Sequence, residues 1–349
     1  MPPPAPGVIL DNYEVDVRFE YVRGRGQLHG KPLFYTIRLR APGMRDIQTW
    51  LKVFPNAGCE ESLHLCQYPR EAGAMERVGH RQRIMEATQK RVLSLLDTDE
   101  NPHGSVVAME YFEGGTLHDR MQEIKNWPLR RKLNLLMELA QSLVLVVDAD
   151  IVHQDLKPSN VMLGPDDHPI IFDFGLSKIP ELDYMEKAGT PPYMAPEVAR
   201  GEIHERSDMM SFGIMAWEIL KGEAFYTAID PLPTSTRAFL MLLGEQTAET
   251  IDGIAQSANF SDFGDLEGPI GAMLKNLTRF DPNQRWDIDT LMRHLAPLTM
   301  GESHGLEWLT DFNFTREAVD MLLELDHPEL VKPSRRTPRA MDRDLGIDA

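Results

Sequence analysis

The stretch IVHQDLKPSN, residues 151–160, decides the fold that this sequence predicts. An apolar pair precedes a histidine, Asp155, Lys157 and Asn160, and the proline between the last two favours a loop. Thirteen residues after Asn160, Asp173 follows the apolar run of IIFDFGLSK, a pattern typical of a short buried strand. The two segments therefore place two carboxylates, an amide and an amine at the ends of short elements.

This set of side chains suits magnesium-dependent phosphoryl transfer. One carboxylate accepts the proton of the nucleophile, while a second carboxylate and an amide oxygen hold Mg²⁺, which prefers oxygen ligands. The amine neutralises charge on the phosphate that moves.

Composition excludes several other classes of function. The 349 residues carry a formal net charge of −18, whereas a protein that coats nucleic acid or an anionic membrane surface needs a basic face. The two cysteines, Cys59 and Cys66, form no zinc-ligand pattern, and we expect free thiols in a reducing compartment. No apolar run is long enough to span a bilayer, and MPPPAPG at the start lacks the regions of a signal peptide. We therefore expect a cytoplasmic protein that binds no nucleic acid.

The order of elements runs from strand-rich to helix-rich. Alternation of polar and apolar residues predicts an antiparallel meander near the start, and apolar faces at helical spacing dominate after Gly115. A turn-rich segment, TDENPHG at 98–104, separates the last two strands. The expected strands are residues 13–22, 33–40, 47–54, 91–97 and 105–112. The expected helices are residues 69 to about 90, with Pro69 in the first turn, 116–124, 128–149, 206–221 and much of 235–297.

Three motifs in register resemble those of the eukaryotic-type protein kinases. HQDLKPSN is similar to the catalytic loop, DFG at 173–175 to the metal-binding motif, and GTPPYMAPE at 189–197 to the segment that closes the activation loop. SDMMSFGIMAWEIL is similar to the central helix of the C-lobe, and DPNQRW at 281–286 to the late arginine motif. In that motif Arg285 would pair with Glu197.

The resemblance implies an α+β, bilobal protein-kinase fold. Its N-lobe is an antiparallel sheet plus one helix, and its C-lobe is mostly helical. The implied boundaries are a disordered N-terminus at 1–12, the N-lobe at 13–112, the C-lobe at 113–298, and a C-terminal helix with a disordered tail at 299–349.

The resemblance also assigns catalytic and metal-binding roles. Asp155 would receive the proton of the substrate hydroxyl, and Lys157 would stabilise the γ-phosphate, as is typical of Ser/Thr specificity. Asn160 and Asp173 would hold Mg²⁺. Lys52, the lysine of the third strand, would contact the α- and β-phosphates of ATP.

The helix partner of Lys52 has two candidates. Glu71 is favoured because Met75 and Val78 lie four and seven residues after it, on the same helical face. Glu76 is the alternative.

The resemblance places the ATP base at a hinge. Glu110, Tyr111 and Phe112 would line its edge, Met109 resembles the gatekeeper, and Leu163 would pack under the base. The stacked column that couples the lobes in this family would comprise Leu95, Met75, Phe174, His153 and Asp208. We take His153 as structural rather than catalytic. For Asp208, bracing of the catalytic loop is favoured, and a charge or cap at the helix N-terminus is the alternative.

Two departures from the family pattern concern the nucleotide site. By the resemblance, Gly24, Gly26 and Gly30 would cover the phosphates, and the alternative is an ordinary hairpin turn. In GRGQLHGKP the third glycine comes one residue later than in the family pattern. Trp50 stands two residues before Lys52, where the family has a small alanine. Its indole would fill part of the adenine pocket or require the strand to shift.

Two further departures concern regulation. Gln154 replaces the arginine that in this family pairs with an activation-loop phosphate, and a neutral amide cannot supply that charge. Between Phe174 and Glu197 the hydroxyl-bearing residues are Ser177, Tyr184, Thr190 and Tyr193. We therefore expect intact chemistry without dependence on an activation-loop phosphate.

The sequence thus predicts a Ser/Thr protein kinase that uses ATP and Mg²⁺ and acts on a protein substrate. Two alternatives stay open, a pseudokinase scaffold whose nucleotide site Trp50 has impaired and a small-molecule phosphotransferase. The motif at 189–197 and the Glu197–Arg285 pair favour a protein substrate. Nothing in the sequence predicts an oligomeric state.

Overall fold

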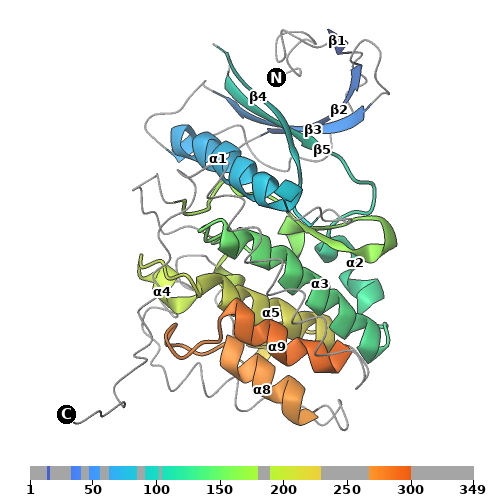
Figure 1. Ribbon diagram of the computed structural model, residues 1–349, viewed down its shortest axis with the longest axis vertical. Helices are drawn as coiled ribbons and strands as arrows, with labels where there is room; N and C mark the ends of the chain where they lie inside the picture. Colours follow the sequence, from blue (N-terminus) through green and yellow to red (C-terminus); the bar gives the residue numbers. More distant parts are fainter. Residues whose placement is uncertain are drawn as a thin grey trace, which may run out of the picture. The chain divides into compact units, whose positions relative to one another are not determined.

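The computed structural model describes residues 14–15, 33–40, 47–55, 63–84, 91–101, 104–179, 189–228 and 267–299 (Figure 1). Its strands are β1 (Glu14–Val15), β2 (Leu33–Arg40), β3 (Ile47–Pro55), β4 (Leu95–Asn101), β5 (Gly104–Glu110), β6 (Val161–Leu163) and β7 (Pro169–Ile171). Its helices are α1 (Leu63–Ile84), α2 (Leu117–Ile124), α3 (Leu129–Asp148), α4 (Pro196–Ala199), α5 (Ser207–Lys221), α8 (Glu267–Leu277) and α9 (Ile288–Thr299). Turns of 3-10 helix lie at Pro158–Asn160, Pro165–Asp167, Pro191–Tyr193 and Phe225–Ala228.

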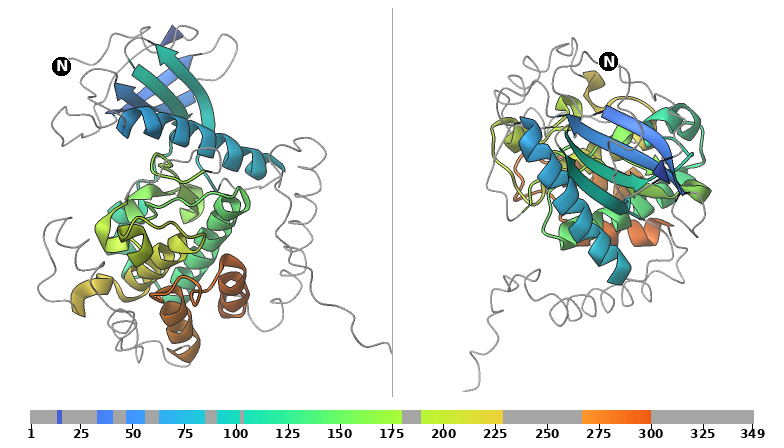
Figure 2. Two further views of the ribbon diagram at one scale, coloured as in Figure 1. Left: turned by 90° about the vertical axis from the view of Figure 1, so that its left-hand side faces the viewer. Right: turned by 90° about the horizontal axis from the view of Figure 1, so that it is seen from above.

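The N-terminal part is one five-stranded antiparallel sheet in the order β1-β2-β3-β5-β4. Helix α1 packs against β3, β4 and β5 (Figures 1 and 2). The register sets Lys52 of β3 opposite Phe34 of β2 and Val107 of β5. Lys52 therefore stands in the middle of a strand that is paired on both sides.

The C-terminal part is built around α3 and α5. Helix α3 packs against α9, α5 and β7, and α5 packs against α8. Thirteen of the fifteen residues of α5 are buried, Ser207 and Asp208 among them, as in a helix enclosed on all sides. The loop between α3 and the β6–β7 hairpin carries Asp155, and the loop after β7 carries Asp173. This arrangement confirms the antiparallel-sheet and helical halves of the predicted α+β, bilobal fold.

Several predicted elements are confirmed within a residue or two. They are β2, β3, α2, α3 and α5. Of the strand predicted at 13–22, Glu14 and Val15 are described as strand, and 16–22 lie outside the described residues.

The predicted start of the first long helix is wrong. Helix α1 begins at Leu63, so Pro69 lies inside it rather than in its first turn. Pro69 has no backbone N–H, so the helix lacks the hydrogen bond that this residue would donate to the carbonyl of Leu65. Pro69 is exposed, and leucine and glutamine residues before it favour the helix, so α1 continues through the proline.

The strand predicted at 91–97 is also misplaced. Val92 and Leu93 are fully buried, but they leave the N-terminal sheet and pair with the C-terminal hairpin. The amide of Leu93 donates to Ile171 O at 3.1 Å, and the amide of Ile171 donates to Arg91 O at 3.1 Å. Strand β4 is Leu95–Asn101 and includes the polar residues 98–101 that were predicted as turn, because it is the edge of its sheet and one face can be solvated.

Helical structure between 235 and 297 is confirmed for α8 and most of α9, and between them the chain forms turns and loop. Residues 229–266 and the tail beyond Thr299 lie outside the described residues. Among the described helices, none is both long and apolar enough to cross a membrane.

Candidate active site

Lys52 lies at the centre of a cluster of three charged groups. Its Nζ donates to Glu71 Oε2 at 2.5 Å and to Asp173 Oδ1 at 2.6 Å. Lys52 and Glu71 are buried, whereas the Asp173 side chain is 30% exposed. Of the two candidate partners of Lys52, Glu71 makes the contact and Glu76 is exposed. The cluster joins β3, α1 and the segment after β7.

The charges of this cluster depend on one another. Burial alone would lower the pKa of Lys52, but the attraction of Asp173 and Glu71 outweighs it and raises that pKa. Burial raises the pKa of Asp173, but Lys52 outweighs burial, so the net pKa is lowered. Burial raises the pKa of Glu71, and Lys52 offsets this only in part because Asp173 lies nearby. One ammonium therefore serves two carboxylates, and Asp173 is the more firmly ionised.

The backbone conformation after β7 directs the side chain of Asp173 toward Lys52. Asp173 has φ 68°, in the left-handed region, and the amide of Phe174 donates to Glu71 Oε1 at 3.1 Å. At Gly175 a Cβ would lie 3.0 Å from Glu71 Oε2 and 3.2 Å from Lys52 Nζ. The glycine of DFG is thus needed because the ion cluster approaches its backbone.

Asp155 and Lys157 meet around a hydroxyl. Lys157 Nζ donates to Asp155 Oδ2 at 2.6 Å and to Thr190 Oγ1 at 2.5 Å. The Thr190 hydroxyl donates to Asp155 Oδ1 at 2.7 Å. Asn160 Nδ2 donates to the backbone oxygen of Asp155 at 2.8 Å and to its Oδ2 at 3.0 Å. A carboxylate that accepts from an alcohol and a cation beside the alcohol oxygen are therefore already in place.

A carboxylate of α5 holds the loop that carries Asp155. The amides of His153 and Gln154 donate to the two carboxylate oxygens of Asp208, at 2.6 and 2.9 Å. Gln154 has φ 64°, so this clamp holds a strained backbone. Asp208 thus braces the catalytic loop, which is more than an N-terminal helix charge would do.

His153 connects this loop to the DFG segment. Its Nε2 lies 3.0 Å from Phe172 O, and its ring centroid lies 4.8 Å from that of Phe174. Met75, Phe174 and His153 are almost fully buried, whereas Leu95 is half-buried. The contact between the rings of His153 and Phe174 is one of the contacts expected in the predicted column.

The residues predicted to surround adenine come from three elements. Met109 is buried in β5, Glu110 ends that strand, and Phe112 is half-buried beyond it. Leu163 is fully buried at the end of β6, and its amide donates to Gly115 O at 2.9 Å. Gly24, Gly26 and Gly30 lie outside the described residues.

Trp50 joins an aromatic cluster at this end of the site. Its ring centroid lies 5.8 Å from that of Tyr111, edge-on, and 5.7 Å from that of Phe172. Tyr111 is in the predicted hinge, and Phe172 directly precedes Asp173. The indole therefore contacts one residue of the predicted adenine site, Tyr111, and the residue before Asp173.

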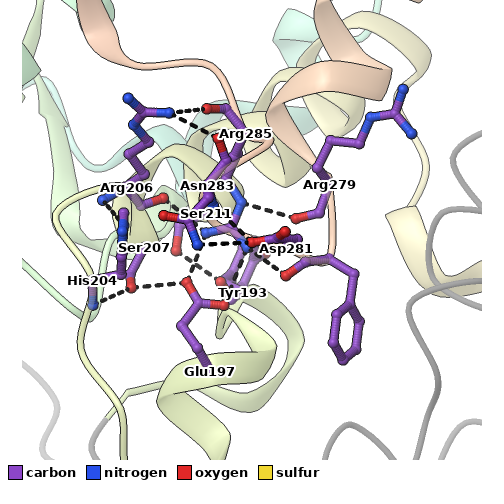
Figure 3. A network of polar contacts seen from close by, with 11 residues as sticks. Tyr193, Glu197, His204, Arg206, Ser207, Ser211, Arg279, Asp281, Asn283 and Arg285 are labelled. Atoms are coloured by element: carbon purple, nitrogen blue, oxygen red, sulfur yellow. Dashed lines mark hydrogen bonds and ion pairs between the residues drawn. The ribbon is translucent and has the colours of Figure 1, made fainter.

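A second buried ion pair holds the end of the GTPPYMAPE segment (Figure 3). Arg285 donates to Glu197 Oε1 at 2.7 Å and to Oε2 at 3.1 Å, and both side chains are at most 2% exposed. Burial raises the pKa of Glu197, but Arg285 outweighs it and the pKa is lowered. Nearby, the Tyr193 hydroxyl donates to Glu218 at 2.9 Å, and Ser211 donates to Tyr193 O at 2.7 Å. The segment is thus fixed to α5 and to the loop before α9.

The residues predicted to bind Mg²⁺ have suitable donor atoms. Asp173 offers an ionised carboxylate, and Asn160 uses its amide nitrogen in the bonds above, so its amide oxygen is the atom that would bind Mg²⁺. Among the described residues, no group of three or more His, Cys, Asp or Glu could hold a metal by itself. One carboxylate and one amide fit Mg²⁺ that takes its other ligands from phosphate and water.

Sequence reasoning missed the part that Thr190 plays. It placed Thr190 in the segment that closes the activation loop, not beside Asp155. Gly189 has φ 130°, and a Cβ there would lie 2.7 Å from Gln154 O. The glycine before Thr190, which lets this segment approach the catalytic loop, was the available signal.

Comparison with known proteins agrees with this geometry. Residues 60–295, more than half of the chain, match the model of the protein kinase domain. Serine/threonine-protein kinase pkn2 of Myxococcus xanthus is 32% identical over 175 residues, 47% of this chain and 21% of the relative. Human calcium/calmodulin-dependent protein kinase type 1B is 28% identical over 218 residues, 61% of this chain and 60% of the relative.

The matched regions thus cover less than two thirds of either relative. Another similar protein is serine/threonine-protein kinase pkn3 of Myxococcus xanthus, 30% identical over 49% of this chain and 32% of the relative. The fold, the three motifs and the extent of the match lead to one conclusion: this chain belongs to the protein kinase domain family.

Proposed function

We propose that the protein is an active Ser/Thr protein kinase that transfers the γ-phosphoryl group of ATP to a hydroxyl of a protein substrate. The observation that carries this proposal is the contact of Asp155 and Lys157 with the Thr190 hydroxyl. An aliphatic alcohol fits between the carboxylate and the ammonium, as a substrate serine or threonine must. The names of the similar proteins support the same class.

Within the chain, each group has a separable task. Asp155 accepts the proton of the attacking hydroxyl, and its position is fixed by Asn160 and by the Asp208 clamp on the loop. Lys157 holds positive charge beside the oxygen that attacks. Lys52, oriented by Glu71, supplies a cation to the nucleotide phosphates.

Mg²⁺ would be held by Asn160 and Asp173 and would neutralise charge on the phosphates when bound. Until then Lys52 neutralises Asp173, which keeps the carboxylate ionised and in place. The chain thus keeps the proposed metal ligand Asp173 ionised and positioned before Mg²⁺ binds.

We further propose that activity needs no activation-loop phosphate. Gln154 is neutral and 6% exposed, and among the described residues its Oε1 has no hydrogen-bond partner. Ser177 is fully buried, and its hydroxyl faces His153 O at 3.4 Å. A buried serine is a poor phosphate acceptor, and Tyr184 lies outside the described residues.

A pseudokinase scaffold is the second candidate. The aromatic contacts of Trp50 favour it, since they fill space at the predicted adenine site. Against it stands the presence of all six side chains that a kinase needs. They form two groups in contact: Lys52 with Glu71 and Asp173, and Asp155 with Lys157 and Asn160.

The deciding experiment is ³²P transfer from Mg-ATP to a generic basic protein, with Asp155→Asn beside the wild type. Transfer by the wild type that falls by at least about 10²-fold in the variant, with phosphoserine or phosphothreonine as product, supports the proposal. Treatment with a phosphatase beforehand should leave the rate unchanged. Absence of transfer, together with no rise of the melting temperature on adding Mg-ATP, favours the scaffold.

A further inference from the structure

Two neighbouring side chains of β3 contact two consecutive residues of the C-terminal part. Trp50 and Lys52 are two residues apart, so they project from the same face of the strand. Lys52 contacts Asp173, and Trp50 contacts Phe172. The phosphate end of the nucleotide site is thus bridged by an ion pair, and the base end by a ring pair.

The indole of Trp50 is held at two sides by the chain's own rings. The interplanar angle is 71° with Tyr111 and 52° with Phe172, and both centroid separations are within the range of favourable aromatic pairs. Met109, the gatekeeper candidate, is the cross-strand partner of Trp50 in the β3–β5 register, so both project from one face. Trp50 therefore touches or adjoins the hinge, the gatekeeper and the residue before DFG.

We propose that Trp50 occupies the purine subsite of the nucleotide-free protein, and that a purine nucleotide binds only after the indole has left Phe172. Trp50 is then a specificity-determining residue that sets the affinity for the nucleotide. The inference rests on the proposed function, because that function places the purine at this hinge.

The ring contacts set how much Trp50 should lower the apparent affinity for the nucleotide. A side chain that must move away lowers the apparent affinity by the fraction of molecules in which it has already moved. Two aromatic pairs of ordinary strength leave that fraction at about one in ten or below. The opposite role, a platform on which the base stacks, would need a free indole face, whereas the contacts with Tyr111 and Phe172 already engage the ring.

The test compares wild type with Trp50→Ala and Trp50→Phe by calorimetric titration with adenosine and with Mg-ADP. Adenosine has no phosphates and reports on the base end alone. Trp50→Ala should bind both ligands about tenfold more tightly, by the same factor. Trp50→Phe keeps a ring against Phe172 and should stay within about threefold of the wild type.

A second variant keeps the inference testable if Trp50→Ala does not fold. Phe172→Leu removes the partner ring and leaves the indole, and it should also tighten adenosine binding. Unchanged or weaker adenosine binding by folded Trp50→Ala or Phe172→Leu overturns the inference, as does binding to none of the four proteins. A gain for Mg-ADP without a gain for adenosine overturns it too, because the effect would then lie at the phosphates.

These readouts are separate from phosphoryl transfer. Tighter adenosine binding by Trp50→Ala in a protein that phosphorylates nothing would uphold the inference and refute the proposed function. Phosphoryl transfer by the wild type, together with unchanged adenosine binding by Trp50→Ala, would support the proposed function and refute the inference.

Discussion

The two buried ion pairs of this kinase domain, Lys52–Glu71 and Arg285–Glu197, look alike at first. Each joins segments that are distant in the sequence, and the shortest N–O distances are 2.5 and 2.7 Å. The surroundings differ. Arg285 engages both oxygens of one carboxylate and also donates to carbonyl oxygens of Arg279, Phe280 and Arg206.

Lys52, in contrast, serves two carboxylates at once, and one of them is partly exposed. Glu197 also accepts from the Ser207 hydroxyl at 2.9 Å, so its pair is saturated by fixed partners. The Arg285–Glu197 pair, whose groups are satisfied by fixed partners, stabilises the fold. The ammonium of Lys52, which is shared by two carboxylates, can exchange one of them for a ligand. The difference indicates structural work for Arg285 and chemical work for Lys52.

The largest expected effect is on stability, at the saturated pair. Arg285→Met leaves the Glu197 charge buried without its partner and should lower the free energy of unfolding by about 3–5 kcal/mol. The measurement is urea denaturation followed by circular dichroism. Arg130→Met, at an exposed arginine that donates to Thr299 O, should cost less than about 1 kcal/mol. Equal losses in the two variants would contradict the structural role of Arg285.

The next effect is on activity, at the shared cation. Lys52→Met removes the positive charge that we propose Lys52 supplies to the nucleotide phosphates, and it should lower the phosphotransfer rate by about 10²–10³-fold. The matched control is Lys132→Met, since Lys132 is also buried but donates to Leu220 O at 3.0 Å. The control should lose stability and keep the rate per folded molecule. A rate loss as large in Lys132→Met would remove the distinction between the two lysines.

A smaller effect is expected at the hydroxyl between Asp155 and Lys157. Thr190→Val keeps the shape and removes both hydrogen bonds to charged groups, and it should lower kcat about tenfold. Thr190→Ser keeps the hydroxyl and should stay within about threefold of the wild type. Steady-state kinetics at saturating Mg-ATP measures both. Equal rates in the two variants would show that the hydroxyl does not orient the catalytic groups.

The smallest expected effect is a difference in pH dependence between the two carboxylates. Burial raises the pKa of Glu71 above its usual 4.5, so its charge costs stability at neutral pH, and this cost is relieved as pH falls through the raised pKa. The pKa of Glu197 is lowered by Arg285 despite burial, so its charge contributes stability above 4.5, and that contribution is lost as pH falls through the lowered pKa.

Unfolding free energies of wild type, Glu71→Gln and Glu197→Gln measure this difference, because glutamine does not titrate. As pH falls from neutral toward 4.5, wild type should gain stability relative to Glu71→Gln. Below 4.5 it should lose stability relative to Glu197→Gln. Parallel curves for the two variants would show that the pairs do not differ electrostatically.

The sequence predicted the parts of this molecule that depend on local pattern. Helical spacing with Met75 and Val78 was enough to favour Glu71 as the partner of Lys52, and the three motifs predicted Asp155 and Asp173 as site residues. It failed where distant segments decide the structure. Val92 and Leu93 are apolar because they meet Ile171 of the other lobe, and no pattern along the chain distinguishes that from a place in the sheet.

The contacts of Trp50 were unpredictable for the same reason. An indole on β3 was visible in the sequence, but its contact with Phe172 depends on how the two lobes meet. Likewise, Thr190 reaches Asp155 only because the segment after the activation loop folds back over residues 153–155.

The bridge from residues 91–93 to Ile171 also has a consequence for motion between the lobes. Gln82 of α1 accepts from the amides of Arg91 and Val92, both at 2.8 Å, so the end of α1 is tied to the same point. That point acts as a pivot, and Glu71, eleven residues earlier on α1, lies about 16 Å along the lever. A rotation of α1 by about 10° about this point, relative to β3, then displaces Glu71 by about 3 Å, which is enough to separate it from Lys52. The ion pair is therefore sensitive to the orientation of α1 against β3.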